Sequence, residues 1–358
     1  MSRPDPGPDA PRRVVRVRVP ATSANLGPGF DALGLALTCY DEVTAEITGG
    51  GLSIEVSGEG EAAAAAGEDH LVVRAMRAAF AGAGGQPPGL ALRCVNAIPQ
   101  GRGLGSSAGA VVAGLIAARF LTLAGTADLT TPQDDAPVEA RHVGSFTVHG
   151  DHPGPAGAAG VYADPELLAL ATQLEGHPDN AAACLAGGLT IAWTPAAPGP
   201  RAIRLEVSPD IVPVLCVPTV TLATSEARRA LPPAVPHHDA AANAGRAALL
   251  VAALTQAPDL LFDATSDLLH QPYRAPLMAA TDRVINALRE AGIAAMLSGA
   301  GPSVLALTVR GRTPGPAEVD SIVAQTGNQW HVSPLDVDRQ GATIQSVPPG
   351  ARIRSSAR

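Results

Sequence analysis

The chain has 358 residues, a length typical of two domains, with 46% hydrophobic and 16% charged residues and a net charge of -8. This composition excludes a disordered chain and argues against broad nucleic-acid binding. All 25 basic residues are Arg, so a Walker A loop, a protein-kinase lobe and Schiff-base chemistry, which all need Lys, are excluded.

Strand and helix patterns mix along the chain and predict an α/β or α+β class. Runs typical of strands cover 14–19, 42–47, 52–56, 90–95 and 189–193. Apolar periodicity predicts helices over 71–81, 107–123, 165–175, 240–255 and 278–291.

Irregular segments divide the chain. Residues 1–12 and 340–358 lack periodicity and are expected to be disordered tails. The Pro-rich segment 194–200 predicts a boundary between an N-terminal domain, 13–200, and a C-terminal domain, 201–339.

The segment 126–160 is expected to be an insertion loop, because loops of this length are uncommon in compact domains. Its three histidines, His142, His149 and His152, could bind a metal. A solvated insertion is preferred, because no helix or hairpin spacing presents them together.

The chain is expected to be cytoplasmic, without a membrane-spanning segment. Its longest apolar stretch, around 109–118, is about half of the ~20 residues that a membrane span requires. The N-terminus has no apolar core and so no signal peptide is predicted. The four cysteines lie far apart among apolar neighbours, as buried thiols do in a reducing compartment.

A glycine-rich segment, PQGRGLGSSA at 99–108, stands between a predicted strand and an apolar helix. Its glycines let the backbone fold around an anion, and the helix start offers free amides and the positive end of a dipole. Ser106 is a good helix cap, and the hydroxyls of Ser106 and Ser107 could also ligate Mg²⁺. We predict a phosphate site made of amides, with an ordinary turn as the alternative.

Two further glycine-rich segments are PATSANLGPGFD at 20–31 and LSGAGPS at 297–303. Asn25 and Asp31 of the first could bind an amine or a hydroxyl. The glycines of the second segment indicate a place where another part of the backbone or a ligand approaches closely. Each alone is explained by a turn, but their combination favours a binding site.

Asp164 and Gly176 predict the bounds of a helix that has Glu175 in its last turn, where the macrodipole disfavours an anion. Directly after it come His177, Pro178, Asp179 and Asn180. Local rules are broken most often at functional sites, so this pattern favours a corner for metal and substrate over a polar turn.

The segment TSEAR at 224–228 predicts a helix capped by Thr224 or Ser225, with Arg228 in its first turn and against the dipole. A guanidinium held there would suit a planar carboxylate, although a solvent-facing Arg is the alternative. Arg274 in QPYRAP gives a weaker signal of the same kind.

In this order, the segments resemble the motifs of the GHMP kinase superfamily over about residues 14–310. PATSANLGPGFD is similar to its first motif, PQGRGLGSSA to its phosphate loop and LSGAGPS to its third motif. EGHPDN, TSEAR and QPYRAP are similar to segments of the members that phosphorylate L-homoserine. The resemblance implies a two-domain α+β fold, with an N-terminal domain like ribosomal protein S5 domain 2 and a ferredoxin-like C-terminal domain.

The resemblance also implies the roles of individual residues. The substrate would be bound by Asn25, Asp31, His177, Asn180, Thr224, Arg228 and Arg274, with the two arginines on its carboxylate. ATP would be bound by Pro99, Gln100, Gly101, Arg102, Gly103, Leu104, Gly105, Ser106, Ser107 and Ala108. Mg²⁺ would be held by Ser107 and Glu175. The catalytic set would be Asn180, Asp179 and Arg228, with Asn180 orienting the hydroxyl and Asp179 not expected to act as a base.

The implied activity is Mg²⁺-dependent transfer of the ATP γ-phosphoryl group to the hydroxyl of L-homoserine, giving O-phospho-L-homoserine for threonine biosynthesis. The alternatives are another GHMP kinase with a mevalonate- or sugar-type substrate, and an inactive ligand sensor with the same fold. Asp69 and His70 replace an Asn often found in the family, which leaves the adenine contacts open. We expect no nucleic-acid partner, and a homodimer is the oligomeric state considered.

Overall fold

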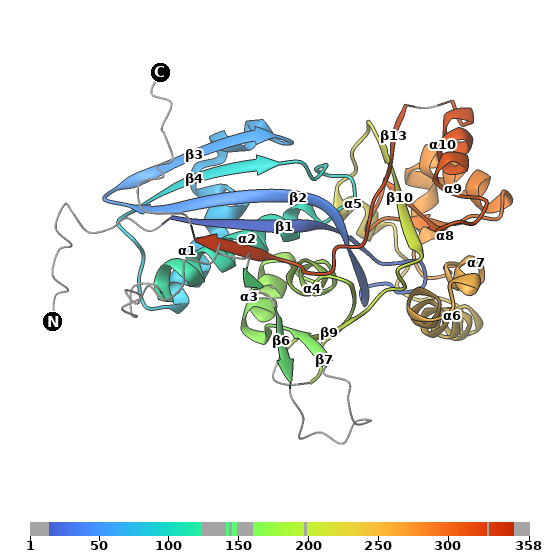
Figure 1. Ribbon diagram of the computed structural model, residues 1–358, viewed down its shortest axis with the longest axis horizontal. Coiled ribbons are helices and arrows are strands. Elements are labelled where there is room, and N and C mark those ends of the chain that lie inside the picture. The colour runs from blue at the N-terminus through green and yellow to red at the C-terminus, as the bar shows by residue number, and fades with distance from the viewer. Residues whose placement is uncertain are drawn as a thin grey trace.

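Two sheets organise the protein (Figure 1). The computed structural model describes residues 14–123, 141–142, 145–148, 160–196, 199–327 and 329–346. Within these residues one sheet has ten strands and the other has four. Figure 1 shows the larger sheet at its left and centre and the smaller one at its right. The predicted two-domain α+β fold is confirmed.

The larger sheet is built around the long strands β1 (Val14–Ala24) and β2 (Leu33–Thr48), which pair antiparallel. At the start of β1 the valines are buried while Arg16 and Arg18 are exposed, as the alternating pattern predicts. The remaining strands are β3 (Gly51–Gly58), β4 (Gly89–Asn96), β5 (Arg141–His142), β6 (Ser145–Val148), β7 (Gly160–Ala163), β8 (Leu189–Trp193), β9 (Arg201–Leu205) and β14 (Thr343–Ser346).

Helices cover one face of this sheet (Figure 1). They are α1 (Leu71–Gly82), α2 (Ser106–Leu123), α3 (Pro165–Glu175) and α4 (Asp179–Ala186). The sequence of α2 is apolar on nearly every side because α2 packs on β1 and is surrounded by the other three helices. The 3-10 helix Glu61–Asp69 leads into α1. The face of the sheet that α2 covers therefore holds the first hydrophobic core.

The smaller sheet has the strand order β11-β12-β10-β13. Its strands are β10 (Ile211–Pro218), β11 (Ala294–Leu297), β12 (Val304–Val309) and β13 (Trp330–Pro334). Because α9 (Ala279–Glu290) precedes β11 and α10 (Pro316–Gln325) precedes β13, the unit has the ferredoxin-like order strand, helix, strand, strand, helix, strand. Between β10 and α9 lie α5 (Thr224–Arg229), α6 (His237–Thr255), the 3-10 turn Pro258–Leu260, α7 (Leu261–Ala264), α8 (Gln271–Arg274) and the 3-10 turn Ala275–Leu277.

One hydrophobic core is shared by the two sheets. Leu35 of β2 and Leu104 pack in the same buried cluster as Leu215 of β10 and Leu305 of β12. Burial of apolar area at this junction stabilises the packing of the two sheets on each other.

Two expected boundaries differ from the structure. Strand β9 pairs with β8, so residues 194–200 connect neighbouring strands of the larger sheet and not two domains. Strand β14 pairs with β1, so the expectation of a disordered tail from residue 340 is wrong for this strand. Local patterns predict neither strand, because their partners are set by pairing along the sheet. Most of the expected insertion loop, with His149 and His152, lies outside the described residues; β5 and β6 fall within its range.

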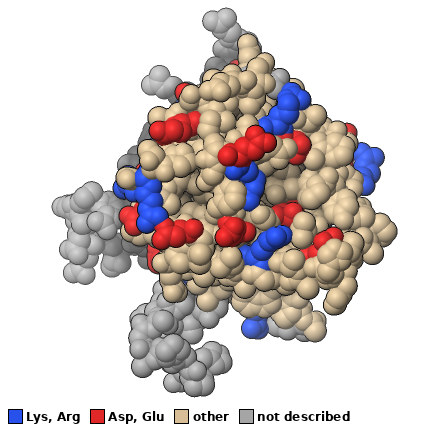
Figure 2. Space-filling model, turned by 90° about the vertical axis from the view of Figure 1, so that its right-hand side faces the viewer, with Lys and Arg blue, Asp and Glu red and all other residues tan. Residues whose placement is uncertain are grey.

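The surface around the smaller sheet carries Arg and acidic side chains interspersed with each other (Figure 2). This face therefore lacks the single-sign basic surface that nucleic-acid binding uses. Among the described residues, no helix is both long and apolar enough to cross a membrane.

The loop formed by residues 99–105 is held between the two sheets by its own carbonyl groups. The carbonyl of Leu104 accepts a hydrogen bond from the amide of Thr22 in β1 at 3.0 Å. The carbonyl of Gly101 accepts from Leu222 at 3.0 Å, and that of Gly103 accepts from the Ser298 hydroxyl at 2.8 Å. Both units thus fix the path of this loop.

A pair of glycine substitutions tests this contact. Gly101 and Gly103 have φ values of 64° and 75°, so Ala at either position meets a backbone strain of about 1–3 kcal/mol. A Cβ at Gly103 would also overlap the Ser298 carbonyl oxygen, whereas at Gly101 its nearest neighbour is the Thr221 side chain at 3.4 Å. We expect Gly103→Ala to lower the free energy of unfolding by about 2 kcal/mol more than Gly101→Ala in urea denaturation. Equal losses would contradict the tight contact.

Candidate active site

A cavity of about 370 Å³ lies where the two sheets meet, directly against the 99–105 loop and the start of α2. Most of the predicted site residues line it: Asn25, Pro99, Gly101, Gly103, Leu104, Gly105, Ser106, Ser107, Ala108, Glu175, His177, Asn180, Thr224, Arg228 and Arg274. The third glycine-rich segment contributes Gly299 and Ala300. The structure therefore brings together residues from Asn25 to Ala300, which lie far apart in the sequence.

The wall formed by residues 101–108 is suited to an anion. The three glycines of the loop all have positive φ, which turns the chain sharply into the first turn of α2. Amides at a helix start lack intrahelical partners and carry a partial positive charge. This end of the cavity can bind phosphate oxygens without an ammonium group.

Two residues of the expected ATP-binding set do not line this cavity. The Arg102 guanidinium donates to the carbonyl oxygens of Pro218 at 3.0 Å and Thr219 at 3.1 Å. It ties the loop to the end of β10, and this use of the side chain was not predicted. Gln100 lies in a neighbouring cavity instead.

Helix α3 has the predicted bounds and places Glu175 beside α2. Asp164 caps its start by accepting from the amides of Glu166 and Leu167, and Gly176 ends it with φ of 88°. Glu175 accepts a hydrogen bond from the Ser107 hydroxyl at 2.7 Å. A carboxylate and a hydroxyl at this distance fit Mg²⁺, which prefers oxygen ligands and takes few of them from the protein when phosphates supply others. Among the described residues, no three or more His, Cys, Asp or Glu side chains are grouped so that they could hold a metal ion.

The corner at the start of α4 is organised by a buried carboxylate. Asp179 is 0% exposed, and its Oδ1 atom accepts from His177 Nδ1 at 2.7 Å and from the Asn180 amide at 2.8 Å. This hydrogen bond raises the pKa of His177, against the opposing effect of burial. Asp179 lies behind the cavity lining, so its observed role is to orient its neighbours.

Asn180 is fixed from a second side. The Thr22 hydroxyl donates to Asn180 Oδ1 at 2.8 Å and holds this side of the amide. One N–H of the amide points back to Asp179 at 3.4 Å, and the other is left for a ligand in the cavity.

Asp31 and Arg228 form a bidentate ion pair, in which Arg228 lines the cavity and Asp31 does not. The two Arg228 nitrogens lie 3.1 Å and 2.9 Å from the two Asp31 oxygens. Asn25 accepts a hydrogen bond from the Asp31 amide at 2.8 Å, and both residues have a positive φ of 52°. The pairing with Asp31 raises the pKa of Arg228.

The sequence pattern predicts that Arg228 lies against the helix dipole, and this prediction is wrong. Helix α5 has only six residues, begins at Thr224 after an uncapped Ala223 and ends at Arg229. Arg228 therefore lies in the last turn, where the dipole favours a cation. The expectation of a cap by Thr224 or Ser225 is also wrong, and Thr224 faces the cavity instead.

Arg274 lies deeper than Arg228. It is 1% exposed, and burial lowers its pKa to about 10. Phe30 lies beside both guanidinium groups. Its ring centre is 5.4 Å from the Cζ atom of Arg274 and 5.8 Å from the Cζ atom of Arg228. Phe30 was not predicted, although it stands in the first glycine-rich motif.

A second cavity of about 290 Å³ adjoins the first across Gly101 and Ser107. Its walls are largely apolar, with the polar residues Asp41, His70, Asn96 and Gln100 among them. Burial raises the pKa of Asp41 to about 6 and lowers the pKa of His70. His70 Nδ1 is buried without a hydrogen-bond partner among the described residues. Asp41 sits in an ordinary strand pattern, which gave no signal of this position.

Comparison with known proteins adds a family to this geometry. The model of the GHMP kinases N terminal domain matches residues 70–135, and that of the GHMP kinases C terminal matches residues 240–330. The homoserine kinase of Streptomyces coelicolor is 48% identical, over 94% of this chain and 96% of that enzyme. That of Streptomyces avermitilis is 46% identical, over 94% and 98%. The solved homoserine kinase from Cytophaga hutchinsonii shares the fold, with a TM-score of 0.69, 24% identity and coverage of 93% and 98%.

Titration of His177 tests the organisation of the corner. Asp179→Asn removes the charge that contributes most to the raised pKa of His177, so we expect that pKa, followed by NMR, to fall below its value in the unaltered protein. Asp31→Asn is the control and should lower it less, because the charge of Asp31 contributes less to this pKa than the charge of Asp179 does. A larger fall in the control would contradict the assignment.

The His177–Asp179 pair also predicts how the stability of the fold depends on pH. Because the pKa of His177 is raised in the folded state, its pairing stabilises the fold fully below the ordinary value of 6.5, and this contribution is lost as pH rises through the folded-state pKa.

Proposed function

We propose, since the chain belongs to the homoserine kinase family of GHMP kinases, that it transfers the γ-phosphoryl group of ATP to the side-chain hydroxyl of L-homoserine. One observation carries the proposal: a single cavity has helix-start amides at one end and two arginines at the other, and one of these arginines is paired with Asp31. The product would be O-phospho-L-homoserine, an intermediate of threonine biosynthesis.

The arginine end suits the charged groups of an α-amino acid. Arg228 and Arg274 would bind the carboxylate, and Asp31 would bind the ammonium group. The Asp31–Arg228 pair is open to solvent, with side chains 36% and 44% exposed, so its own contribution to stability is at most about 1 kcal/mol. The substrate could therefore replace this pairing with contacts of its own at little cost.

The loop end suits a triphosphate. The amides of residues 103–108 would bind phosphate oxygens, and Ser107 with Glu175 would hold Mg²⁺. When bound, that ion would neutralise charge on the phosphates. The adjoining cavity with Asp41 and His70 would take the nucleobase, because it continues directly from the loop.

The acceptor hydroxyl would lie between these ends, near Asn180 and His177. Phosphoryl transfer has a loose transition state, so catalysis depends mainly on positioning and on electrostatic stabilisation. The free N–H of Asn180 can orient the hydroxyl oxygen, while Thr22 fixes the amide. Asp179 would act through His177 and Asn180 and not on the substrate.

A mevalonate- or sugar-type substrate is less well matched, because neither carries an ammonium group for Asp31 next to a carboxylate for the arginines. An inactive sensor is disfavoured because the Ser107–Glu175 contact is present. A homodimer and a cytoplasmic location stay predictions from the sequence.

Arg228→Ala tests the substrate end. Loss of a bidentate carboxylate contact should raise the KM for L-homoserine at least about tenfold and the KM for ATP less than about twofold. Arg229→Ala is the matched control, because Arg229 is exposed on the same helix and donates only to the Ser225 carbonyl in the structure described. Steady-state kinetics with a coupled ADP assay gives both constants. A rise of both KM values by the same factor would count against the assignment.

Glu175→Gln tests the metal end. The neutral amide keeps the size of the side chain but loses the negative charge that attracts Mg²⁺. We therefore expect kcat to fall about 100-fold or more and the Mg²⁺ concentration needed for half-maximal activity to rise. Glu166→Gln, on the exposed first turn of the same helix, should leave both unchanged. Near-full activity of Glu175→Gln at low Mg²⁺ would rule out the role.

A further inference from the structure

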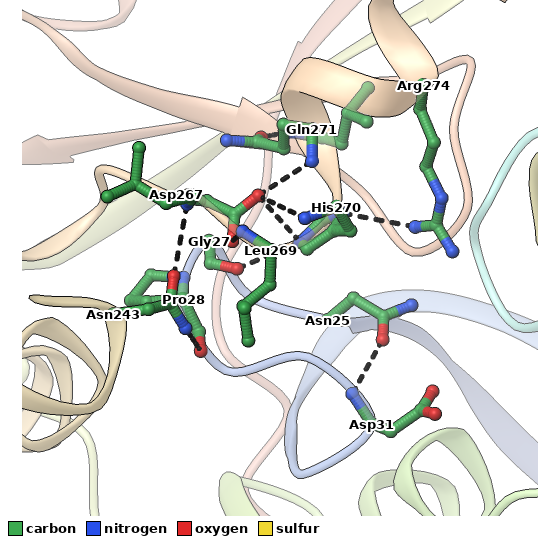
Figure 3. A network of polar contacts seen from close by, with 12 residues as sticks. Asn25, Gly27, Pro28, Asp31, Asn243, Asp267, Leu269, His270, Gln271 and Arg274 are labelled. Atoms are coloured by element: carbon green, nitrogen blue, oxygen red, sulfur yellow. Dashed lines mark hydrogen bonds and ion pairs between the residues drawn. The ribbon is translucent and has the colours of Figure 1, made fainter. Parts of the chain in front are cut away.

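A buried histidine connects Arg274 to the first glycine-rich segment. His270 is 0% exposed and does not line the substrate cavity. Its Nδ1 atom lies 3.1 Å from an Arg274 nitrogen, and its Nε2 atom lies 2.9 Å from the Gly27 carbonyl oxygen. Figure 3 shows the imidazole between the guanidinium and the segment that carries Asn25 and Asp31.

The partners of His270 determine its protonation state. A guanidinium offers only donors, so Nδ1 must accept from Arg274. Nε2 then carries the proton and donates it to the Gly27 carbonyl, which can only accept. The imidazole is therefore neutral in this arrangement.

All the hydrogen-bond acceptors that the described residues give Arg274 are uncharged. Besides His270 they are the carbonyl oxygens of Ala227 at 3.2 Å and Gly299 at 3.4 Å. A carboxylate in this position would neutralise the guanidinium and compete with an incoming anion. Neutral acceptors orient the side chain and leave its charge available to the cavity.

The backbone around His270 is held by a second buried side chain. Asp267 accepts from the amides of Leu269 at 2.9 Å, His270 at 3.0 Å and Gln271 at 2.7 Å (Figure 3). Asn243 donates to the Pro28 carbonyl at 2.8 Å and accepts from Leu268 at 3.1 Å. The turn with His270 and the segment with Gly27 are thus fixed to one another.

We propose that neutral His270 is a positioning residue, which holds the Arg274 guanidinium at the carboxylate end of the substrate through the hydrogen bond to Nδ1. The inference rests on the proposed function, because it assigns Arg274 to the substrate carboxylate. Its consequence is that L-homoserine affinity depends on an imidazole that never touches the substrate.

Protonation of His270 would remove this support. The charged groups that act on it are Asp267, with an oxygen 3.6 Å from Nε2, and Arg274. Arg274 is in turn influenced by the charges of Arg228 and Asp31. Burial lowers the pKa of His270 below its ordinary value of 6.5, so the neutral form prevails at pH 7. An imidazolium has no acceptor for Arg274 and repels it, so L-homoserine affinity should fall as pH drops through the His270 pKa.

The test compares His270→Asn with His270→Leu. The Asn side chain can present an oxygen where Nδ1 lies, whereas Leu has similar bulk and no acceptor. With His270→Leu we expect the KM for L-homoserine to rise about tenfold, while kcat and the KM for ATP change less than about twofold. With His270→Asn the KM for L-homoserine should stay within about threefold of the unaltered enzyme. Thermal unfolding of both variants reports whether the fold is kept.

A pH profile gives an independent readout that does not need the Leu variant. The KM for L-homoserine should rise towards acid pH in the unaltered enzyme more steeply than in His270→Asn, since only the former can charge this position. Parallel profiles would contradict the charging of His270 in that pH range. The positioning role is overturned if a folded His270→Leu enzyme keeps its KM for L-homoserine or changes both KM values equally. Absence of L-homoserine-dependent ADP formation by the unaltered enzyme would instead contradict the proposed function.

Discussion

The hydrogen bonds that hold the 99–105 loop between the two sheets determine where the rest of the cavity lies. β1 and the segments after β10 and β11 all donate to carbonyl oxygens of this loop. The loop in turn sets the start of α2, whose amides form the anion end of the cavity. The same turn at Ser298 leads to Gly299, which accepts from Arg274 at the opposite end. This set of contacts thus fixes the separation between the loop end and the arginine end of the cavity.

A chain without Lys has to bind anions by other means, and the proposed function assigns three of them. Backbone amides would bind the phosphates, a hydroxyl with a carboxylate would offer oxygen ligands for a divalent ion, and arginines would bind a carboxylate. The two arginines are prepared differently. Arg228 is exposed and paired with Asp31, so it can exchange partners, while Arg274 is buried among neutral acceptors and keeps its charge unneutralised. Buried neutral groups can therefore be as important to an ionic site as the charges themselves.

Much of the site could be predicted from the sequence, because glycine-rich turns and misplaced charges leave local signals. The bounds of α3 and the position of Glu175 follow from Asp164 and Gly176, and the structure confirms them. Other features depend on partners that are distant in the sequence. His270 gains its importance from Gly27, more than 240 positions away, and β14 exists through pairing with β1. The placement of Arg228 was predicted wrongly because the length of α5 was not fixed by any local stop signal.

The proposed function requires one cavity to hold a triphosphate and both charged groups of an amino acid together. Its most direct test is ADP formation with ATP and Mg²⁺ in the presence of L-homoserine, of 4-hydroxybutyrate, which lacks the ammonium group, and of 3-amino-1-propanol, which lacks the carboxylate. We expect kcat/KM for L-homoserine to exceed that for either analogue by at least about 100-fold, since each analogue leaves one charged partner of the site unsatisfied. Comparable turnover with 4-hydroxybutyrate or with mevalonate would contradict the account.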